Sequence, residues 1–438
     1  MHSNPQPNTG RDPAPRRLSP LGNSGDNAQT RTQQRAQPAQ ASPMLFVAPH
    51  RAMFLSGAVM LLVSFAMWAL ELSARAGLMP AIGWVLPPAW MHALLVTSGV
   101  FPFFMFGFLL TAMPRWQGYD EIAPGRWLWA WRLLAAGWAL TVAGMLVPGI
   151  AILGLMLVLV GWGGLQRILW QVAHHGDLEA LHARLVCYAM IAGMAAVLAW
   201  LGFAASGNPI WARVAIEVAV FCSLLPVFFG VCHRMVPFFS SGVIPAYVMV
   251  RPLWVMVLVV GGSALHAVLD VAGLQALRWV VDAPAAFAAL WLSRQWRPVP
   301  ALKVPLLGML HIGFLWLGIA LTLFSIQGVA SLLGYAVLGL APLHAIGVGF
   351  FGSVLLAMVS RVSLGHSGRK LVADRLTWGL FLGLELVVVI RVLAEVVPAG
   401  WSATVMLLAV LGWLGVFGAW ATRYLPIYWR PRSDGRPG

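Results

Sequence analysis

The chain has 438 residues, of which 60% are hydrophobic and 10% are charged, and its mean hydropathy is +0.81. A soluble domain carries about 25% charged residues, so this composition excludes an ordinary soluble protein. It predicts an all-α, polytopic membrane protein in contact with the lipid bilayer, because the apolar runs are long and unbroken rather than short and alternating. The net charge of +14 is typical of basic cytoplasmic loops, so we expect no nucleic-acid partner.

The first segment, residues 1–43, is rich in Pro, Gln, Asn, Ser and Arg and cannot bury enough apolar surface to fold. It lacks the pattern of a signal peptide, so we expect a disordered basic tail. Residues 44–425 are predicted to form a twelve-helix transmembrane domain, and 426–438 a short basic tail. The expected spans, each near the roughly 20 residues that cross a bilayer, are 52–72, 90–113, 127–147, 149–170, 184–205, 210–233, 250–270, 273–293, 303–327, 336–360, 376–397 and 402–423.

The third and fourth spans are separated only by Val147-Pro148-Gly149, which suits a tight turn. With the N-terminus inside, most arginines and lysines fall in cytoplasmic loops, so both termini are expected in the cytoplasm. The opposite side has four arginines, each with a carboxylate four residues away on one helix face. Either each pair neutralises itself at the boundary, which we favour, or the four form a ring that binds an anionic group such as haem propionates. The pairs are Glu71 with Arg75, Arg213 with Glu217, Arg278 with Asp282, and Arg391 with Glu395.

Glu385, near the middle of the eleventh span, has no basic residue at helical spacing. An intramembrane carboxylate is a functional candidate, or else a protonated side chain bonded to a neighbouring helix. The cysteines Cys187, Cys222 and Cys232 lack CxxC spacing and are interpreted as small buried hydrophobes. No HExxH, Walker or Rossmann pattern is present, so hydrolase or nucleotide chemistry of those types has no support.

Histidines in or near the apolar runs are the main candidates for chemistry. One membrane histidine usually bonds to a neighbouring helix, whereas several at matching depth favour a haem or metal site, because neutral imidazole binds iron and copper. His174, His175 and His182 fall in a polar loop and are expected to be surface residues. The others are His92 and His344 in the outer half, His266 near the outer end of the seventh span, His311 deeper, and His233 and His366 at the inner boundary.

Several stretches resemble the NnrS family. The tenth span and its loop, "LHAIGVGFFGSVLLAMVSRVSLGHSGR" from Leu343, resemble the family's LHAL-type helix with its T/S-R-x-S-L-G-H-T/S-G-R turn. The stretch "HALLVTSGVFPFFMFGFLLTAMPRWQG" from His92 is similar to its HAHEM-to-GFLLTAVPNWTG segment. "RMVPFFS" from Arg234 and "LHIGFLWLG" from Leu310 resemble its R-V-I-P-F-F and L-H-x-G-Y segments. These matches run in the expected order between about residues 90 and 370.

The resemblance implies a twelve-span bacterial inner-membrane protein that carries haem and copper and is associated with nitric oxide metabolism and resistance to nitrosative stress. It leaves the molecular activity, and whether the protein is an enzyme, open. By position, His92, His311, His344 and His366 match family histidines, and Arg361 and Arg369 match the arginines that flank the turn. These six residues are therefore the expected cofactor-binding set.

The chain departs from the family where HAHEM is replaced by His92, Ala93, Leu94, Leu95 and Val96, so a histidine and a glutamate are missing. This leaves part of the expected ligand set. The expected metal ligands are His92 and His344, the preferred haem pair, with His233 and Cys232 as substitutes, although a boundary histidine bonded to a carbonyl is the commoner arrangement.

Two other functions stay open. One is a transporter of a small or metal-related solute, with Glu385 as proton carrier. The other is a membrane partner protein without cofactors, which the missing HAHEM residues favour.

Overall fold

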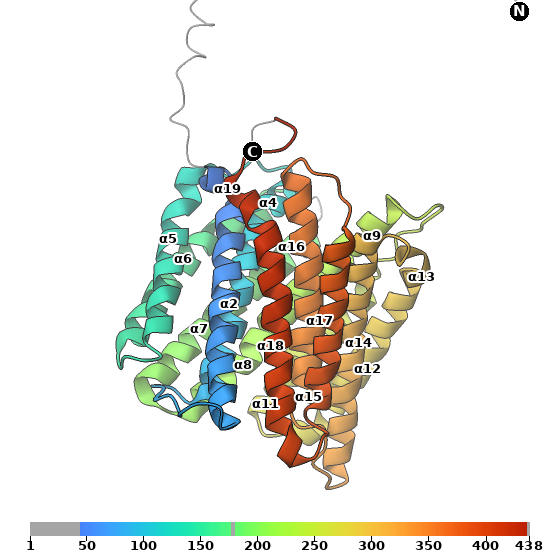
Figure 1. Ribbon diagram of the computed structural model, residues 1–438. Helices are drawn as coiled ribbons and strands as arrows, with labels where there is room; N and C mark the ends of the chain where they lie inside the picture. The colour runs from blue at the N-terminus through green and yellow to red at the C-terminus, as the bar shows by residue number, and fades with distance from the viewer. Residues whose placement is uncertain (1–43, 177–179, 436–438) are drawn as a thin grey trace, which may run out of the picture. The chain divides into compact units, whose positions relative to one another are not determined.

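The structure, a computed structural model, describes residues 44–176 and 180–435, and these residues are helical with no β-strand among them. The predicted tail 1–43 lies outside the described residues, as do 177–179 and 436–438. Long helices lie side by side (Figure 1). The all-α fold expected from composition is confirmed.

Twelve helical rods fill the described part of the chain, and each overlaps one predicted span. In chain order they are α2 (Pro49–Arg75); α3 (Pro88–Ala93), η2 (Leu94–Val100) and α4 (Phe101–Gln117); α5 (Pro124–Ala143); α6 (Ile150–Ala173); α7 (Ala180–Ser206); α8 (Pro209–Glu217), η3 (Val218–Leu224) and α9 (Leu225–Ser241); α10 (Leu253–Met256), η4 (Val257–Gly261) and α11 (Gly262–Val271); α12 (Trp279–Gln295); α14 (Pro305–Leu332); α15 (Ala341–His344), η6 (Ala345–Gly352) and α16 (Ser353–His366); α17 (Arg375–Leu393); and α18 (Ala399–Tyr424). Short pieces are η1 (Met44–Phe46), η5 (Gln275–Leu277), α13 (Pro298–Ala301) and α19 (Pro426–Trp429).

Ten of these rods are long and apolar enough to cross a membrane, counted over the described residues. The protein is therefore a polytopic helical membrane protein. The remaining two rods are helical where spans were expected, but α12, with 17 residues, is too short, and α5, with 20 residues, is not apolar enough. The count of twelve membrane spans stays a prediction.

Four π-helical segments, η2, η3, η4 and η6, interrupt four of these rods. Such segments are rare and are frequent at functional sites. The three longest lie in the rods that are most enclosed: Pro88–Gln117, Pro209–Ser241 and Ala341–His366, with 78%, 72% and 78% of their most apolar stretch buried. These three segments are thus in the interior, where protein rather than lipid surrounds them, whereas η4 lies in a rod with 33% of its most apolar stretch buried.

The helices α5 and α6 form a tight antiparallel hairpin through small residues. Gly149, at φ +82°, turns the chain between them, as Val147-Pro148-Gly149 predicts. A Cβ at Gly154 would lie 2.5 Å from Thr141 Oγ1 and 2.6 Å from Thr141 N, so only glycine permits this approach. Close contact of small residues is how helices associate where lipid replaces water.

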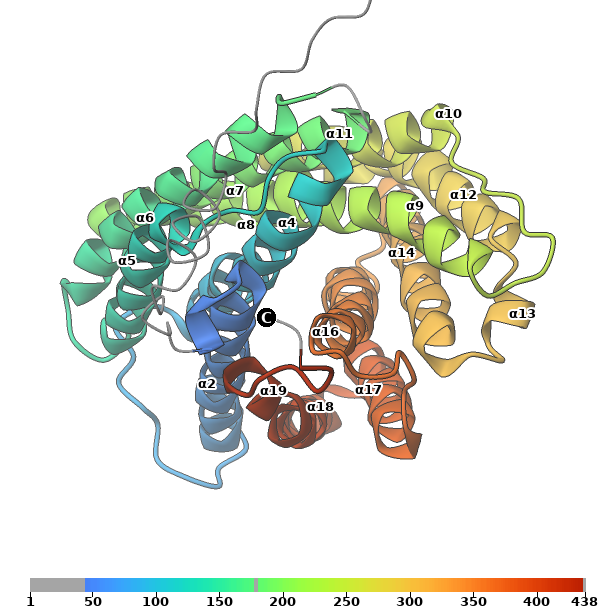
Figure 2. The same ribbon diagram turned by 90° about the horizontal axis from the view of Figure 1, so that it is seen from above.

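The first and last long helices are neighbours, as seen from above in Figure 2, where α2 lies beside α18. At the end of the bundle where α2 begins and α18 ends, Arg51 is buried, with 2% of its surface exposed. It donates through Nη1 to the carbonyls of Met44, Tyr428 and Arg430 at 3.3, 3.4 and 3.0 Å. We call this end, which carries α19, the C-terminal face, and the other end, which carries α15, the opposite face (Figure 1).

Candidate functional site

The first candidate pair, His92 and His344, lies toward the opposite face. His92 is in α3, two residues before η2, and its ring stacks on Trp68 of α2 at a centroid distance of 4.5 Å. His344 ends α15 directly before η6, and its Nδ1–H donates to the Leu340 carbonyl at 2.9 Å. That bond fixes the tautomer and leaves the Nε2 lone pair of His344 available, which is the usual state of a histidine that binds a metal.

Arg391 lies close enough to both imidazoles for its positive charge to act on His92 and on His344, and His92 also acts on His344. Arg391 pairs with Glu395 at 2.8 Å, as the i,i+4 spacing predicts. His92 Nδ1 is buried without a hydrogen-bond partner. Imidazoles with free nitrogen atoms and a neighbouring guanidinium are the kinds of group that would hold a haem, since histidine nitrogen binds its iron and arginine binds its propionates.

A second imidazole pair lies at the C-terminal face. His50, in the first turn of α2, packs against His366 with ring centroids 4.7 Å apart. The charges of Arg51 and Arg115 act on both rings, and Arg369 Nη1 is buried without a hydrogen-bond partner. His50 was missed in the sequence because the first predicted span begins at residue 52, whereas α2 begins at Pro49.

His366 was expected in a loop, but α16 continues to it and makes it the last helical residue. The turn that follows is ordered: Gly368 has φ +72°, and the Ser433 N–H donates to the Ser367 carbonyl at 2.9 Å. Arg361, expected to bind a cofactor, lies over the Phe239 ring with its guanidinium carbon 3.8 Å from the centroid. The hydrogen bond between Ser433 and Ser367 thus packs the turn against the C-terminal segment.

Below His50 and His366 is an apolar cavity of about 50 Å³. It lies between α2, α4, α9 and α16, one helical turn from each histidine at Phe54 and Val362. Its other lining residues include Phe104, Phe108, Val227 and Met358. A space of this size and polarity stays dry and suits a very small apolar molecule.

Two further predicted residues form hydrogen bonds inside the bundle. His311 Nε2 lies 3.1 Å from Ser240 Oγ, and both residues are buried. His233 Nδ1 lies 3.0 Å from Nε2 of His182, so one of the two rings donates a hydrogen bond to the other. The expectation that His182 is a surface residue is wrong: it is 7% exposed, because α7 begins at Ala180 and includes it. Cys232 is buried, and its role as a ligand stays a prediction.

Glu385 holds three helices together. Trp316 Nε1 of α14 donates to one carboxylate oxygen at 2.6 Å, and Ser353 Oγ of α16 donates to the other at 2.7 Å. Both oxygens of this α17 side chain are thus occupied. The arrangement favours a structural role over proton transport.

Two of the four expected arginine–carboxylate pairs form, and the other two arginines bind a different carboxylate. Arg75 binds Glu71 at 2.7 Å, and Arg391 binds Glu395. Arg213 and Arg278 instead both bind Asp270, from a different helix. A tertiary partner replaces the local one there, and spacing along one helix gives no signal for such a contact.

The four π-helical segments border the residues at the opposite face. His92 precedes η2, Glu217 precedes η3, His266 follows η4, and His344 precedes η6. The same four residues are the candidates for metal or cofactor binding at that face.

Comparison with known proteins identifies the family of this chain. A search of curated proteins found no match. The model of the NnrS protein family matches residues 44–432, which is nearly the whole of the described chain. This protein therefore belongs to the NnrS family.

Proposed function

We propose that this protein binds haem through His92 and His344 and acts in nitric oxide metabolism or nitrosative-stress tolerance in the bacterial inner membrane, with both termini in the cytoplasm. Membership of the NnrS family supports the haem and the nitric oxide role. The observation that carries the ligand assignment is the fixed tautomer of His344, whose free Nε2 lies within electrostatic range of His92 and Arg391.

In this proposal each residue has a distinct task. The Leu340 carbonyl orients His344, and the Trp68 ring orients His92. Arg391, kept in place by Glu395, is the donor for a propionate. When bound, haem supplies an iron atom that exchanges electrons and binds diatomic ligands.

The alternative haem site is the pair His50 and His366. The buried, unpartnered Arg369 Nη1 favours it, because a guanidinium in that position suits a propionate. The positive charge of Arg51 and Arg115 disfavours a bare cation there and favours an anionic group. Copper, which the family resemblance also implies, has His233 and Cys232 as its candidate ligands.

The test is an absorption spectrum and a metal analysis on detergent-purified full-length protein and its variants. We expect a Soret band in the wild type and a lower haem-to-protein ratio in His92→Ala and His344→Ala. His174→Ala is the matched control, because His174 is exposed and contacts the ring and the backbone carbonyl of Trp170, far along the chain from both pairs. A loss confined to His50→Ala and His366→Ala assigns the haem to the alternative pair, and a wild type without a Soret band refutes haem binding.

A further inference from the structure

A third cluster, separate from both imidazole pairs, lies where α8 and α11 meet near the opposite face. Glu217 ends α8, and His266 and Asp270 are one turn apart on α11. Each residue offers one ligand atom, and these three atoms lie within 4.8 Å of one another. They come from two helices, each of which is interrupted next to the cluster by a π-helical segment.

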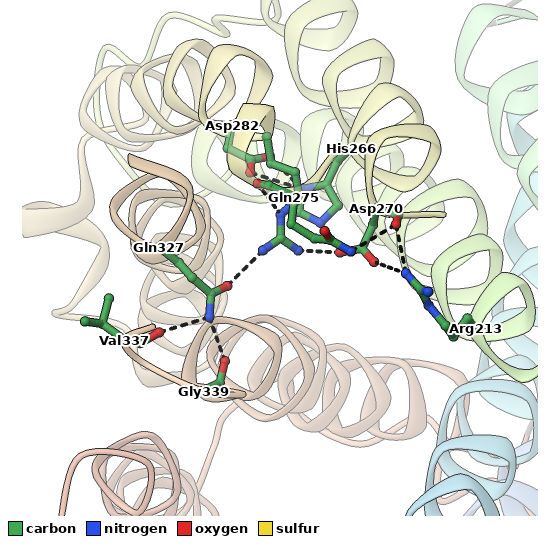
Figure 3. A network of polar contacts seen from close by, with 9 residues as sticks. Arg213, His266, Asp270, Gln275, Asp282, Gln327, Val337 and Gly339 are labelled. Atoms are coloured by element: carbon green, nitrogen blue, oxygen red, sulfur yellow. Dashed lines mark hydrogen bonds and ion pairs between the residues drawn. The ribbon is translucent and has the colours of Figure 1, made fainter. Parts of the chain in front are cut away.

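His266 is oriented by a buried carboxylate. Its Nδ1–H donates to Asp282 of α12, at 2.8 Å to Oδ1 and 3.0 Å to Oδ2, and the side chains of both residues are 1% exposed. Figure 3 shows His266 between Asp282 on one side and Asp270 on the other. The remaining nitrogen, Nε2, is buried without a hydrogen-bond partner. A carboxylate on one imidazole nitrogen and a free lone pair on the other is the arrangement that surrounds metal-bound histidines.

Glu217 is the second unsatisfied group. Its Oε2 is buried without a hydrogen-bond partner, and a buried carboxylate oxygen in that state is costly. A cation shared with His266 Nε2 satisfies both atoms at once.

Asp270 contributes a carboxylate that is already neutralised in part. Arg278 Nη1 binds its Oδ2 at 2.5 Å, and Arg213 Nη2 lies 3.6 Å from its Oδ1. Three carboxylates, including Asp282, and two guanidinium groups give the cluster a net charge of −1 with His266 neutral. Binding of a divalent cation reverses this to +1, a small net charge in either state.

We propose that Glu217, His266 and Asp270 bind a divalent cation of the first transition row, with Asp282 as the positioning residue for His266. Two carboxylate oxygens and one imidazole nitrogen suit Mn²⁺, Fe²⁺ or Zn²⁺, whereas Cu⁺ prefers sulfur ligands. Ligands at about 2.0–2.2 Å from a metal lie at most about 4.4 Å apart. The three ligand atoms, which lie within 4.8 Å of one another, therefore need to approach by no more than about 0.4 Å to bind one ion.

The experiment uses full-length protein in detergent, treated with a chelator and then titrated with Mn²⁺ alone. Low-temperature electron paramagnetic resonance reports bound Mn²⁺, and elemental analysis gives its stoichiometry without interference from haem iron. We expect one equivalent of Mn²⁺ in the wild type and at least a 100-fold loss of affinity in His266→Ala and Glu217→Gln. Asp282→Asn weakens binding by about 10–100-fold and changes the spectrum, and Asp282→Glu restores part of both.

The matched control is Glu71→Gln, another carboxylate near this face, which binds Arg75 and Trp84 and lies outside the cluster. We expect it to bind Mn²⁺ as the wild type does. Size-exclusion elution and thermal unfolding show that each variant is folded before it is scored. The proposal is overturned by a folded wild type that binds no Mn²⁺, or by folded Glu217→Gln and His266→Ala proteins that bind it with wild-type affinity. The Soret band reports on the haem proposal separately, so the two fail independently.

Discussion

The imidazole rings of His50 and His366 lie with their centroids 4.7 Å apart, which joins the start of the first long helix to the end of α16. Both residues belong to a polar layer at the C-terminal face that also contains Arg51 and the carbonyls of the C-terminal segment. This layer connects the two ends of the described chain.

Arg51→Ala is expected to destabilise the protein. The change leaves three backbone carbonyls without their donor, and each buried unsatisfied group costs about 1–3 kcal/mol. Thermal unfolding followed by tryptophan fluorescence in detergent measures the loss. The control is Arg115→Ala, because the ion pair of Arg115 with Glu121 at 3.3 Å is exposed and worth about 0–1 kcal/mol. Equal melting temperatures for the two variants contradict this role for Arg51.

His344→Ala is expected to regain haem when imidazole is added. Truncation removes the axial nitrogen but leaves the Leu340 carbonyl and Arg391 in place, so a free imidazole has both a site and an acceptor. The measurement is the Soret intensity of the purified variant with haem, before and after imidazole is added. Added imidazole should change nothing in His174→Ala, and a His344→Ala spectrum that stays identical to the wild type throughout excludes His344 as a ligand.

Gly154→Leu is expected to separate α5 from α6. The new Cβ would lie 2.5–2.7 Å from Thr141 and from the Gly137 carbonyl, so the backbones must move apart. We expect a loss of stability of about 3 kcal/mol, at the upper end for overpacking. Gly163→Leu is the matched control on the same helix, because a Cβ there meets nothing within 4 Å. Similar unfolding temperatures for the two variants argue against close contact in the hairpin.

Asp374→Ala is expected to cost stability at neutral pH and little in acid. Asp374 caps α17, accepting from the Thr377 N–H at 2.8 Å and from Arg423 Nη2 at 2.9 Å. The hydrogen bond from the Thr377 backbone is the main cause that lowers the pKa of this carboxyl below its usual value. A lowered pKa in the folded state means that the stabilisation is present above the unfolded pKa, near 3.9, and disappears as pH falls through the folded value.

The measurement is the melting temperature of wild type and Asp374→Ala between pH 7 and pH 3. At neutral pH we expect a difference of about 0.5–2 kcal/mol, as for other N-terminal caps. The difference should shrink below about pH 4. A difference that is constant down to pH 3 shows that the carboxylate charge plays no part.

Much of the fold could be predicted from the sequence, because the backbone N–H and C=O groups of every span must form hydrogen bonds within the protein when lipid surrounds it. An apolar run of sufficient length is helical, and all twelve predicted runs coincide with helical rods. The π-helical segments were not predicted, since residues such as Ala345–Gly352 are apolar and fit a regular helix equally well.

The candidate sites were accessible in part. The motifs singled out His92, His344 and His366, whose role as ligands stays a prediction, and the structure packs His366 against the ring of His50. The cluster of Glu217, His266 and Asp270 was missed because spacing on one helix assigned Glu217 to Arg213. The actual partner of Arg213 is Asp270, 57 residues further along the chain. Only the packing of α8 against α11 decides between these partners.

The segment η6 has a consequence for the rod that carries both His344 and His366. A π-helical bond spans one residue more than an α-helical one, so removal of one residue from Ala345–Gly352 would restore a continuous α-helix. Each residue of an α-helix advances the direction of the side chain by about 100°. Because the π-helical segment absorbs the extra residue, the α-helical parts on either side of it keep nearly the phase of one continuous helix, and such a deletion would leave His344 and His366 close to their present directions. A one-residue deletion within α16 has no such compensation and would turn His366 by about 100° away from His50. The rod can therefore change its length at η6 without misdirecting the side chains at its two ends.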